Sequence, residues 1–194
     1  MRDTLKRLWM RWALRGVRYS DAHGRLDEAY RVPDPWRLAG PAEAARFAAT
    51  NRILLAGLGR PETLLEVGCG EGHHSERLAG ACGRLTGIDV SARAVARAKA
   101  RLSGAEFLAA DLFSSELDRR APFDAAAACE VLYYMKDPGA AVARLSGLAR
   151  GVLVTVFEGE WTRLAPVLDA VPRARSEVFS AEGTRWKAWW WRRG

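Results

Sequence analysis

Short apolar runs alternate with alanine-rich stretches of helical periodicity through the middle of the chain. The apolar runs fall at 63–67, 84–88, 105–108, 123–129 and 150–157, and the helical stretches fall at 74–81, 91–102 and 138–147. Apolar runs of about four to eight residues, separated by helices long enough for a crossover, are typical of buried strands in a parallel sheet. The pattern therefore predicts an α/β fold with five parallel strands and helices on both faces.

The end of the chain follows a different pattern. A helical stretch at 161–169 precedes two strand-like runs, 171–179 and 184–191, which are joined by the short connector 180–183. Such a pair predicts a hairpin that closes one edge of the sheet. Alternation along the second run would place Trp189 and Trp191 on one face and Trp190 on the other.

The first 42 residues predict a separate N-terminal region. Residues 3–19 have the pattern of a basic amphipathic helix, with apolar positions at Leu5, Leu8, Trp9, Trp12 and Tyr19. Its tryptophan face would pack on the domain or an oligomer partner, lie on an anionic membrane surface, or contact nucleic acid. Residues 20–41 contain three prolines and two glycines, which predicts a lid or linker, and a helix is expected from residue 43 to about residue 56.

The charge is concentrated at the two ends of the chain. The 194 residues carry a formal net charge of +7, of which residues 1–20 contribute +5 and residues 185–194 contribute +4. The body between them is therefore slightly acidic, and a basic groove for nucleic acid is not indicated there.

The three cysteines and the hydropathy indicate where the protein works. Cys69, Cys82 and Cys129 are an odd number at wide spacings, with no zinc-ligand pattern, which favours a reducing cytoplasm and predicts no metal. The apolar runs are shorter than the roughly 20 residues of a membrane span, and the N-terminus lacks a signal-peptide core. We expect a cytoplasmic protein, with peripheral contact at the inner membrane face through residues 1–19 as an alternative.

A glycine-rich turn follows the first predicted strand. The segment Leu64–Gly72 reads LLEVGCGEG and passes from strand to helix, with Glu66, Gly68, Cys69 and Gly70 around the turn. Glycine is needed where the chain turns tightly and where a ligand approaches the backbone. A dinucleotide fingerprint would have its third glycine at the position that His73 occupies, so the GxGxG spacing departs from that fingerprint.

Two acids follow the next two strands at the same edge of the sheet. Asp89, followed by Val90, ends the second strand, and a carboxylate there accepts hydrogen bonds from both ribose hydroxyls. Asp111 lies 22 residues further on, where it would accept from an adenine amino group while Leu112 covers the ring. The order glycine turn, ribose acid, adenine acid predicts a bound adenosine.

This combination resembles the class I S-adenosylmethionine-dependent methyltransferases over roughly residues 43–191. The resemblance implies a Rossmann-like, seven-stranded sheet with a reversed last strand in a domain spanning 43–194. It also implies S-adenosylmethionine as the cofactor and S-adenosylhomocysteine as the product. The loop after the fourth strand departs from the Asn/Asp-Pro-Pro-Tyr signature, which argues against methylation of adenine N6 or glutamine.

Short sequence segments indicate a branch of that family. Asp34-Pro35-Trp36 ahead of residues 43–47, with Cys129-Glu130-Val131-Leu132-Tyr133-Tyr134 downstream, resembles the NodS-like enzymes. Those enzymes N-methylate the amino sugar of a chito-oligosaccharide, so the resemblance implies an amine or hydroxyl of a saccharide or related small metabolite as acceptor. We do not carry the nodulation role over.

The candidate catalytic residues are Glu130, Tyr133 and His73. Glu130 would accept the acceptor's proton or bind its ammonium, or would simply favour the positive end of a helix. Tyr133 and Trp36 would form an aromatic wall that stabilises the sulfonium and positions a sugar ring, or would serve only in packing within the domain. His73 would act as a base or would only begin a helix.

The remaining cofactor contacts come from Arg46 and Cys129. The resemblance implies that Arg46 would pair with the cofactor's carboxylate, and that the residues just past the strand ending at Cys129 would border the methionine moiety. Two other functions stay open at this point: an RNA methyltransferase, and a non-catalytic cofactor-binding module docked to a membrane or partner. The acceptor atom, the number of methyl groups and the oligomeric state are not determined by the sequence.

Overall fold

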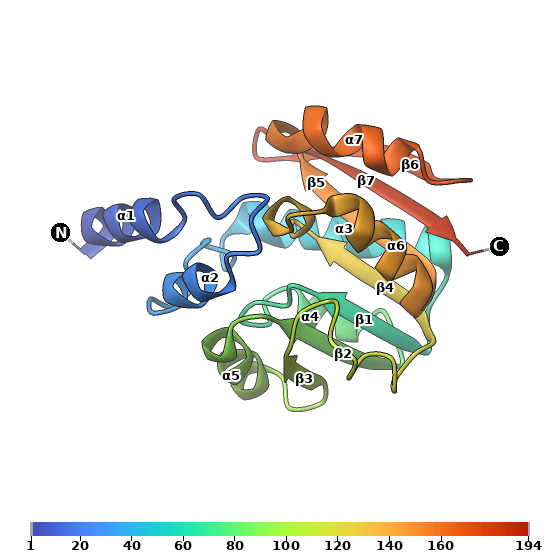
Figure 1. Ribbon diagram of the computed structural model, residues 1–194, viewed down its shortest axis with the longest axis horizontal. Helices are drawn as coiled ribbons and strands as arrows, with labels where there is room; N and C mark the ends of the chain where they lie inside the picture. The colour runs from blue at the N-terminus through green and yellow to red at the C-terminus, as the bar shows by residue number, and fades with distance from the viewer. Residues whose placement is uncertain (1, 194) are drawn as a thin grey trace.

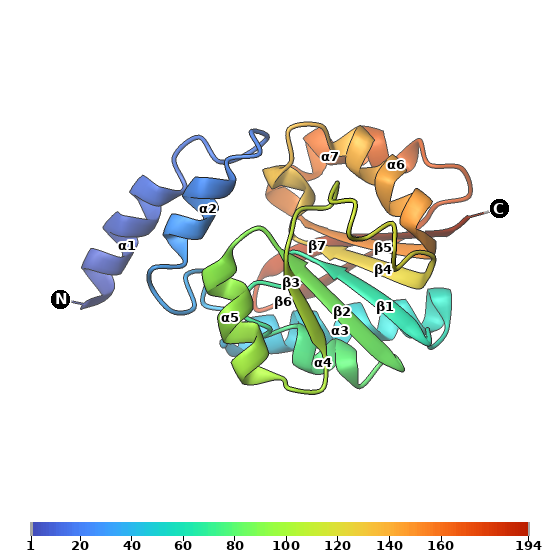
Figure 2. The same cartoon turned by 60° about the horizontal axis from the view of Figure 1, so that its bottom comes forward.

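A seven-stranded sheet with helices on both faces forms the body of the protein (Figure 1, Figure 2). The computed structural model describes residues 2–193, with side chains from residue 8 onward. The strand order is β3-β2-β1-β4-β5-β7-β6. The strands are β1 (Thr63–Val67), β2 (Arg84–Asp89), β3 (Glu106–Ala109), β4 (Phe123–Cys129), β5 (Ala149–Phe157), β6 (Arg175–Ala181) and β7 (Thr184–Arg192).

The predicted topology is confirmed. Strands β1 to β5 pair in parallel, and β7 pairs antiparallel with both β5 and β6. The C-terminal hairpin therefore closes one edge of the sheet, with β7 as the reversed strand. This is the Rossmann-like arrangement with a reversed last strand that the sequence predicted.

The helices also follow the predicted order. They are α1 (Arg2–Ala13), α2 (His23–Ala29), α3 (Pro41–Leu58), α4 (Ser75–Ala79), α5 (Ala92–Arg101), α6 (Pro138–Leu148) and α7 (Trp161–Asp169), with the short 3₁₀ turns η1 (Leu132–Tyr134) and η2 (Glu158–Glu160). Local capping defines several of the starts. The side chains of Ser91 and Asp137 accept hydrogen bonds from the backbone N–H of Ala94 and Ala140, which fixes the first turns of α5 and α6.

Three predicted segments differ from the structure. The first helix ends at Ala13 and not at residue 19, because Gly16 and Tyr19 have φ values of +70° and +56° that no helix continues through. Strand β6 begins at Arg175 because residues 171–174 form a turn after α7. The predicted linker contains the short helix α2.

Alternation along the strands builds a separate core on each face of the sheet. Leu65 of β1 faces α6 and α7, whereas its neighbour Leu64 faces α3 and α4. Helix α5 covers the β2 and β3 end of the α3 face, where Phe107 packs (Figure 2). As predicted, the tryptophans of β7 separate by face: Trp189 and Trp191 join the first core and Trp190 the second.

The N-terminal region lies at the end of the sheet where the parallel strands finish. Helix α1 extends beyond α2 at one end of the molecule (Figure 1) and packs on α2. Leu8 and Trp12 are 56% and 55% exposed, while Ala13 and Val17 are buried. None of the helices between residues 2 and 193 combines the length and apolar character that a membrane crossing requires.

Candidate functional site

A cavity of about 480 Å³ opens at the carboxyl ends of the parallel strands. Its volume lies in the range of small-molecule sites, and its position is the one where α/β sheets bind ligands. Thirteen of the fourteen residues that the sequence predicted for the site line this cavity: Trp36, Arg46, Glu66, Gly68, Cys69, Gly70, Asp89, Val90, Asp111, Leu112, Cys129, Glu130 and Tyr133.

The glycine turn between β1 and α4 is held open against the end of β2. Gly68 and Gly70 have φ values of +75° and +53°, which disfavour other residues. A Cβ on Gly68 would lie 2.7 Å from Val131, and one on Gly70 would lie 2.8 Å from the Tyr30 hydroxyl. The turn therefore needs glycine both for its conformation and for space.

Asp89 fixes the turn while facing the cavity. Its carboxylate accepts hydrogen bonds from the backbone N–H of Gly70 and of Ser91, both at 2.9 Å. Burial raises its pKa to about 6, although these two hydrogen bonds favour the charged form. Because a carboxylate has about four acceptor positions, Asp89 keeps acceptor capacity for hydroxyl groups of a ligand.

Asp111 and Leu112 lie at the β3 end of the cavity beside Val90. Asp111 accepts a 2.7 Å hydrogen bond from the backbone N–H of Phe113, and Leu112 is buried. The three residues form the wall next to Asp89, which is where the sequence predicted the adenine.

Arg46 places an unpaired nitrogen, Nη1, in the lining of the same cavity. The side chain is 4% exposed, and its Nε and Nη2 pair with Glu43 Oε2, each at 2.6 Å. Its Nη1 is buried without a hydrogen-bond partner among the described residues. Burial acts to lower the pKa of Arg46, but the charges of Glu130 and Glu43 outweigh it and raise that pKa. A buried donor left open in a ligand-sized cavity suits an anionic ligand group.

Glu66 and His74 form the floor beneath Arg46. The Glu66 carboxylate accepts a 2.5 Å hydrogen bond from the Ser75 hydroxyl, and burial raises its pKa to about 7. His74 stacks on Phe47, and burial, aided by Arg46, lowers its pKa well below the usual value. The imidazole is therefore neutral at physiological pH.

Glu130 follows β4 and is oriented by β5. Thr155 Oγ1 and the backbone N–H of Phe157 donate to its two carboxylate oxygens, each at 3.1 Å, and the Tyr133 hydroxyl lies 3.4 Å from one of them. Burial raises the pKa of Glu130 to about 7, with Arg46 as the largest opposing influence. These donors come from β5 and from Tyr133 of η1, so specific hydrogen bonds orient the carboxylate.

An aromatic wall closes the cavity next to Glu130. Trp36 donates from Nε1 to the Tyr134 hydroxyl at 3.1 Å and packs on Tyr30, with ring centroids 4.9 Å apart. Tyr133 packs on Tyr134 and Phe157, with centroids 4.7 and 5.7 Å apart. The side chains serve in packing and also line the cavity.

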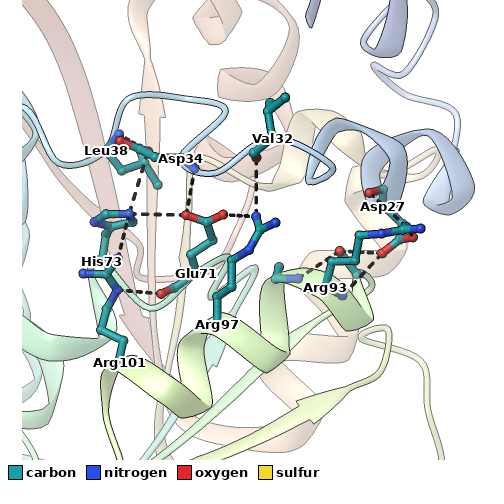
Figure 3. Close-up of polar contacts among 11 residues, drawn as sticks. Asp27, Val32, Asp34, Leu38, Glu71, His73, Arg93, Arg97 and Arg101 are labelled. Atoms are coloured by element: carbon teal, nitrogen blue, oxygen red, sulfur yellow. Dashed lines mark hydrogen bonds and ion pairs between the residues drawn. The ribbon is translucent and has the colours of Figure 1, made fainter. Parts of the chain in front are cut away.

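His73 lies outside this site. Its Nε2 faces Arg101, Glu71 and Asp34 at 3.3, 3.6 and 3.8 Å (Figure 3), whereas the neighbouring His74 lines the cavity. Of the two adjacent histidines, it is His74, the N-cap residue of α4, that faces the cavity. We therefore do not carry a catalytic role for His73 forward.

Several lining residues were not predicted from the sequence. Thr184 and Trp186 reach the cavity from β7, and Phe157 reaches it from the end of β5. Thr184 and Trp186 gave no signal because the hairpin is distant in sequence from the glycine turn and carries no motif. Cys69, Cys82 and Cys129 are free thiols, and burial raises the pKa of the cavity-lining Cys129 to about 12.

Comparison with known proteins identifies the family. The sequence model of the nodulation protein S (NodS) family matches residues 19–182. Nodulation protein S of Sinorhizobium fredii is 40% identical over 119 residues, which are 59% of this chain and 54% of the relative. The Rhizobium tropici protein is 38% identical over 128 residues, or 63% and 52% of the two chains. The matched part thus spans about half the length of these curated relatives.

Solved structures agree with this result. The crystal structure of N-methyltransferase NodS from Bradyrhizobium japonicum, in complex with S-adenosyl-L-homocysteine, is 25% identical with a TM-score of 0.72, and the match covers 90% of this chain and 99% of that one. A magnesium protoporphyrin IX methyltransferase from Synechocystis shares the fold at 17% identity and a TM-score of 0.66, over 91% and 94% of the two chains. Since the family match covers well over half of its residues, the chain belongs to the nodulation protein S family, a branch of the class I S-adenosylmethionine-dependent methyltransferases.

Proposed function

We propose that the protein transfers a methyl group from S-adenosylmethionine to an amine of a saccharide or related small metabolite. The observation that carries the proposal is the single cavity that joins Asp89 at one end to the open Nη1 of Arg46 and the carboxylate of Glu130 at the other. Similarity to a structure named as an N-methyltransferase supports the choice of nitrogen.

The residues present fit the cofactor at both of its ends. Asp89 would accept the ribose hydroxyls, and Val90, Asp111 and Leu112 would surround the adenine. Arg46 Nη1, which lacks a partner among residues 8–193, would donate to the cofactor's carboxylate. Gly68 and Gly70 leave room for the chain between these ends.

Acids outnumber basic residues among the charged side chains that line the cavity, and this supports an amine acceptor over RNA. The charged lining residues other than histidine are Asp21, Glu43, Glu66, Asp89, Asp111, Glu130 and Arg46. Six acids and one arginine would repel a phosphate backbone and attract an ammonium group. The excess of positive charge that an RNA enzyme would need at the cleft is instead carried by residues 1–20 and 185–194 of the sequence.

Glu130 would prepare the acceptor for reaction. An amine enters mainly as an ammonium ion, and the Glu130 carboxylate takes one of its protons so that the nitrogen lone pair is free. The cofactor would supply a methyl carbon that is bonded to a positively charged sulfur. The nitrogen would form a bond to this carbon from the side opposite the sulfur, and the sulfur would leave as part of S-adenosylhomocysteine. A pKa of about 7 suits this exchange because it lies near the working pH. Tyr133 and Trp36 would hold the acceptor in place.

The first test is calorimetric titration of the purified chain with S-adenosylhomocysteine, with NAD as the control ligand. We expect binding of the first ligand alone, and severe loss of that binding in Asp89→Ala with the fold retained by circular dichroism. Asp118→Ala is the matched control, because Asp118 is an exposed acid that pairs with Arg144. Unchanged affinity in Asp89→Ala would refute the site assignment.

The second test separates amine from hydroxyl acceptors. Chitosan oligosaccharides, which have free amines, and fully N-acetylated oligosaccharides of equal length present the same hydroxyls. We expect methyl transfer to the first set only, detected by mass spectrometry. Transfer to both sets would indicate a hydroxyl acceptor, and binding without any turnover would favour a non-catalytic module.

Peripheral contact with an anionic membrane through residues 1–19 is also part of the proposal. The exposed side chains of Leu8 and Trp12 lie on a helix that carries basic residues and extends beyond the domain. This is the composition of helices that lie at a membrane interface.

A further inference from the structure

The segment 30–40 crosses the edge of the cavity and contributes two of its aromatic walls. Tyr30 is 6% exposed and Trp36 is half-buried, and both line the cavity. The Tyr30 hydroxyl lies against the Gly70 backbone. Between these aromatic residues the chain leaves the cavity and contacts the outer side of the glycine turn.

Glu71 joins that segment to the body of the protein (Figure 3). Its Oε2 accepts a 2.9 Å hydrogen bond from the backbone N–H of Asp34, and its Oε1 pairs with Arg97 at 2.5 Å. Arg97 also reaches the carbonyl of Val32 at 3.4 Å, so carboxylate and guanidinium together hold residues 32–34. We refer to Glu71 and Arg97 as the Glu71 bridge.

Glu71 is connected to the ligand site through the backbone but does not line that site. Its side chain is 4% exposed but does not line the cavity. The residue before it is Gly70, whose N–H is held by Asp89. The carbonyl of Glu71 accepts a 2.8 Å hydrogen bond from Arg101 Nε, so both its backbone and side chain are anchored to α5.

A second contact holds the same region further upstream. Asp27 of α2 accepts a 2.7 Å hydrogen bond from the Ser91 hydroxyl and pairs with Arg93. The segment that carries Tyr30 is thus held before it by Asp27 and after it by Glu71. Asp27 meets the first turn of α5 directly after the ribose-binding position, and Glu71 meets the glycine turn.

A metal ion is the alternative occupant of the Glu71 cluster. One ligand atom each from Asp34, Glu71 and His73 lie within 4.8 Å of one another. However, both Glu71 oxygens already have partners, and Arg97 and Arg101 bring two guanidinium groups to the same place. Their positive charge would oppose a metal cation. The cluster is therefore better explained as a connection between segments.

We propose that Glu71 is a positioning residue that holds Tyr30 and Trp36 over the bound cofactor and thereby sets the rate at which the cofactor leaves. The inference rests on the proposed function, since it takes the cavity to be the cofactor site. Breaking the bridge removes the contacts of Glu71 and Arg97 with residues 32–34, which lets the aromatic wall open more often without replacing any group that touches the ligand. Dissociation should therefore accelerate more than association changes.

The test measures release of S-adenosylhomocysteine by stopped-flow tryptophan fluorescence in Glu71→Gln. Glutamine keeps an acceptor for the Asp34 N–H but loses the ion pair with Arg97. We expect dissociation about tenfold faster, equivalent to about 1.4 kcal/mol, with an association rate within about twofold. Arg97→Gln should match this change, and the double variant should add little to either one.

Glu76→Gln is the matched control. Glu76 lies five residues further on, is 46% exposed and pairs with Arg101 at 3.6 Å, whereas Glu71 pairs with Arg97. Its dissociation rate should equal that of the wild type. A wild-type dissociation rate in Glu71→Gln, or an equal acceleration in Glu76→Gln, would overturn the proposal.

A ligand-free measurement separates this inference from the proposed function. Trypsin would cut after Arg31 or Arg37, both of which lie in the held segment. We expect cleavage there to be several times faster in Glu71→Gln than in the wild type or Glu76→Gln, even without cofactor. If neither the wild type nor the variants bind S-adenosylhomocysteine, the proposed function fails. Equal cleavage rates in all three proteins would instead show that Glu71 does not hold residues 32–34.

Discussion

Arg46 and Glu43 lie one turn apart on α3 and pair at 2.6 Å, which fixes the guanidinium so that its Nη1 remains buried and open. Such an arrangement costs stability unless a ligand supplies the missing acceptor. The protein thus holds a charged donor ready in the cavity before the ligand arrives.

Replacement of Arg46 by glutamine should weaken S-adenosylhomocysteine binding by about 10- to 100-fold, which corresponds to the loss of a hydrogen bond to a charged group. Binding of methylthioadenosine, which lacks the carboxylate, should change much less. Calorimetry with both ligands checks this. The matched control is Arg52→Gln, since Arg52 lies on the same helix but is exposed and pairs with Glu177. Equal losses for the two ligands would mean that Arg46 does not bind the carboxylate.

The pH dependence of methyl transfer should report the titration of Glu130. Its carboxylate forms as the pH rises through about 7, so kcat/KM for the amine should rise over that range and then level off. In Glu130→Gln the rise of kcat/KM with pH should disappear and kcat should fall by about 10²- to 10⁴-fold, while the affinity for S-adenosylhomocysteine is retained. Glu158→Gln, an exposed acid nearby, serves as the control. If kcat/KM still rises with pH in Glu130→Gln, the rise comes from titration of the acceptor amine and not of Glu130.

The contact between α3 and β7 should make Gly57 intolerant of a side chain. A Cβ on Gly57 would lie 2.4 Å from Trp190 Nε1, so Gly57→Ala should destabilise the fold by about 1–3 kcal/mol despite the better helix propensity of alanine. The same change at Gly147 of α6, where nothing lies within 4 Å, should stabilise by about 0.5–1 kcal/mol. Thermal unfolding of both variants measures the difference, and similar shifts would contradict the packing argument.

Helix α1 should bind anionic lipid. Sedimentation with phosphatidylglycerol vesicles should retain the protein at low salt, whereas phosphatidylcholine vesicles should not, and added salt should weaken the binding. The double change Leu8→Ser and Trp12→Ser should abolish it. Val178→Ser removes a similarly exposed apolar side chain from β6 and should have no effect. Equal retention by both lipids would argue against electrostatic attraction.

The sequence was sufficient for the sheet and for the positions around the glycine turn. Apolar runs between helices defined the parallel strands, because residues in a doubly covered sheet must be buried on both faces. The glycine turn, Asp89 and Asp111 were recognisable because parallel strands bring their carboxyl ends to one edge, wherever those strands lie in the chain.

Only the tertiary structure decided which neighbouring residues face the cavity. It placed His74 in the cavity and His73 outside it, and it left the Nη1 of Arg46 open while fixing Glu130 through Thr155 and Phe157. It also brought Glu71 under residues 32–34, a contact that no motif marks. Local periodicity specifies which elements form, but side-chain direction after a turn and contacts between distant segments depend on how those elements pack.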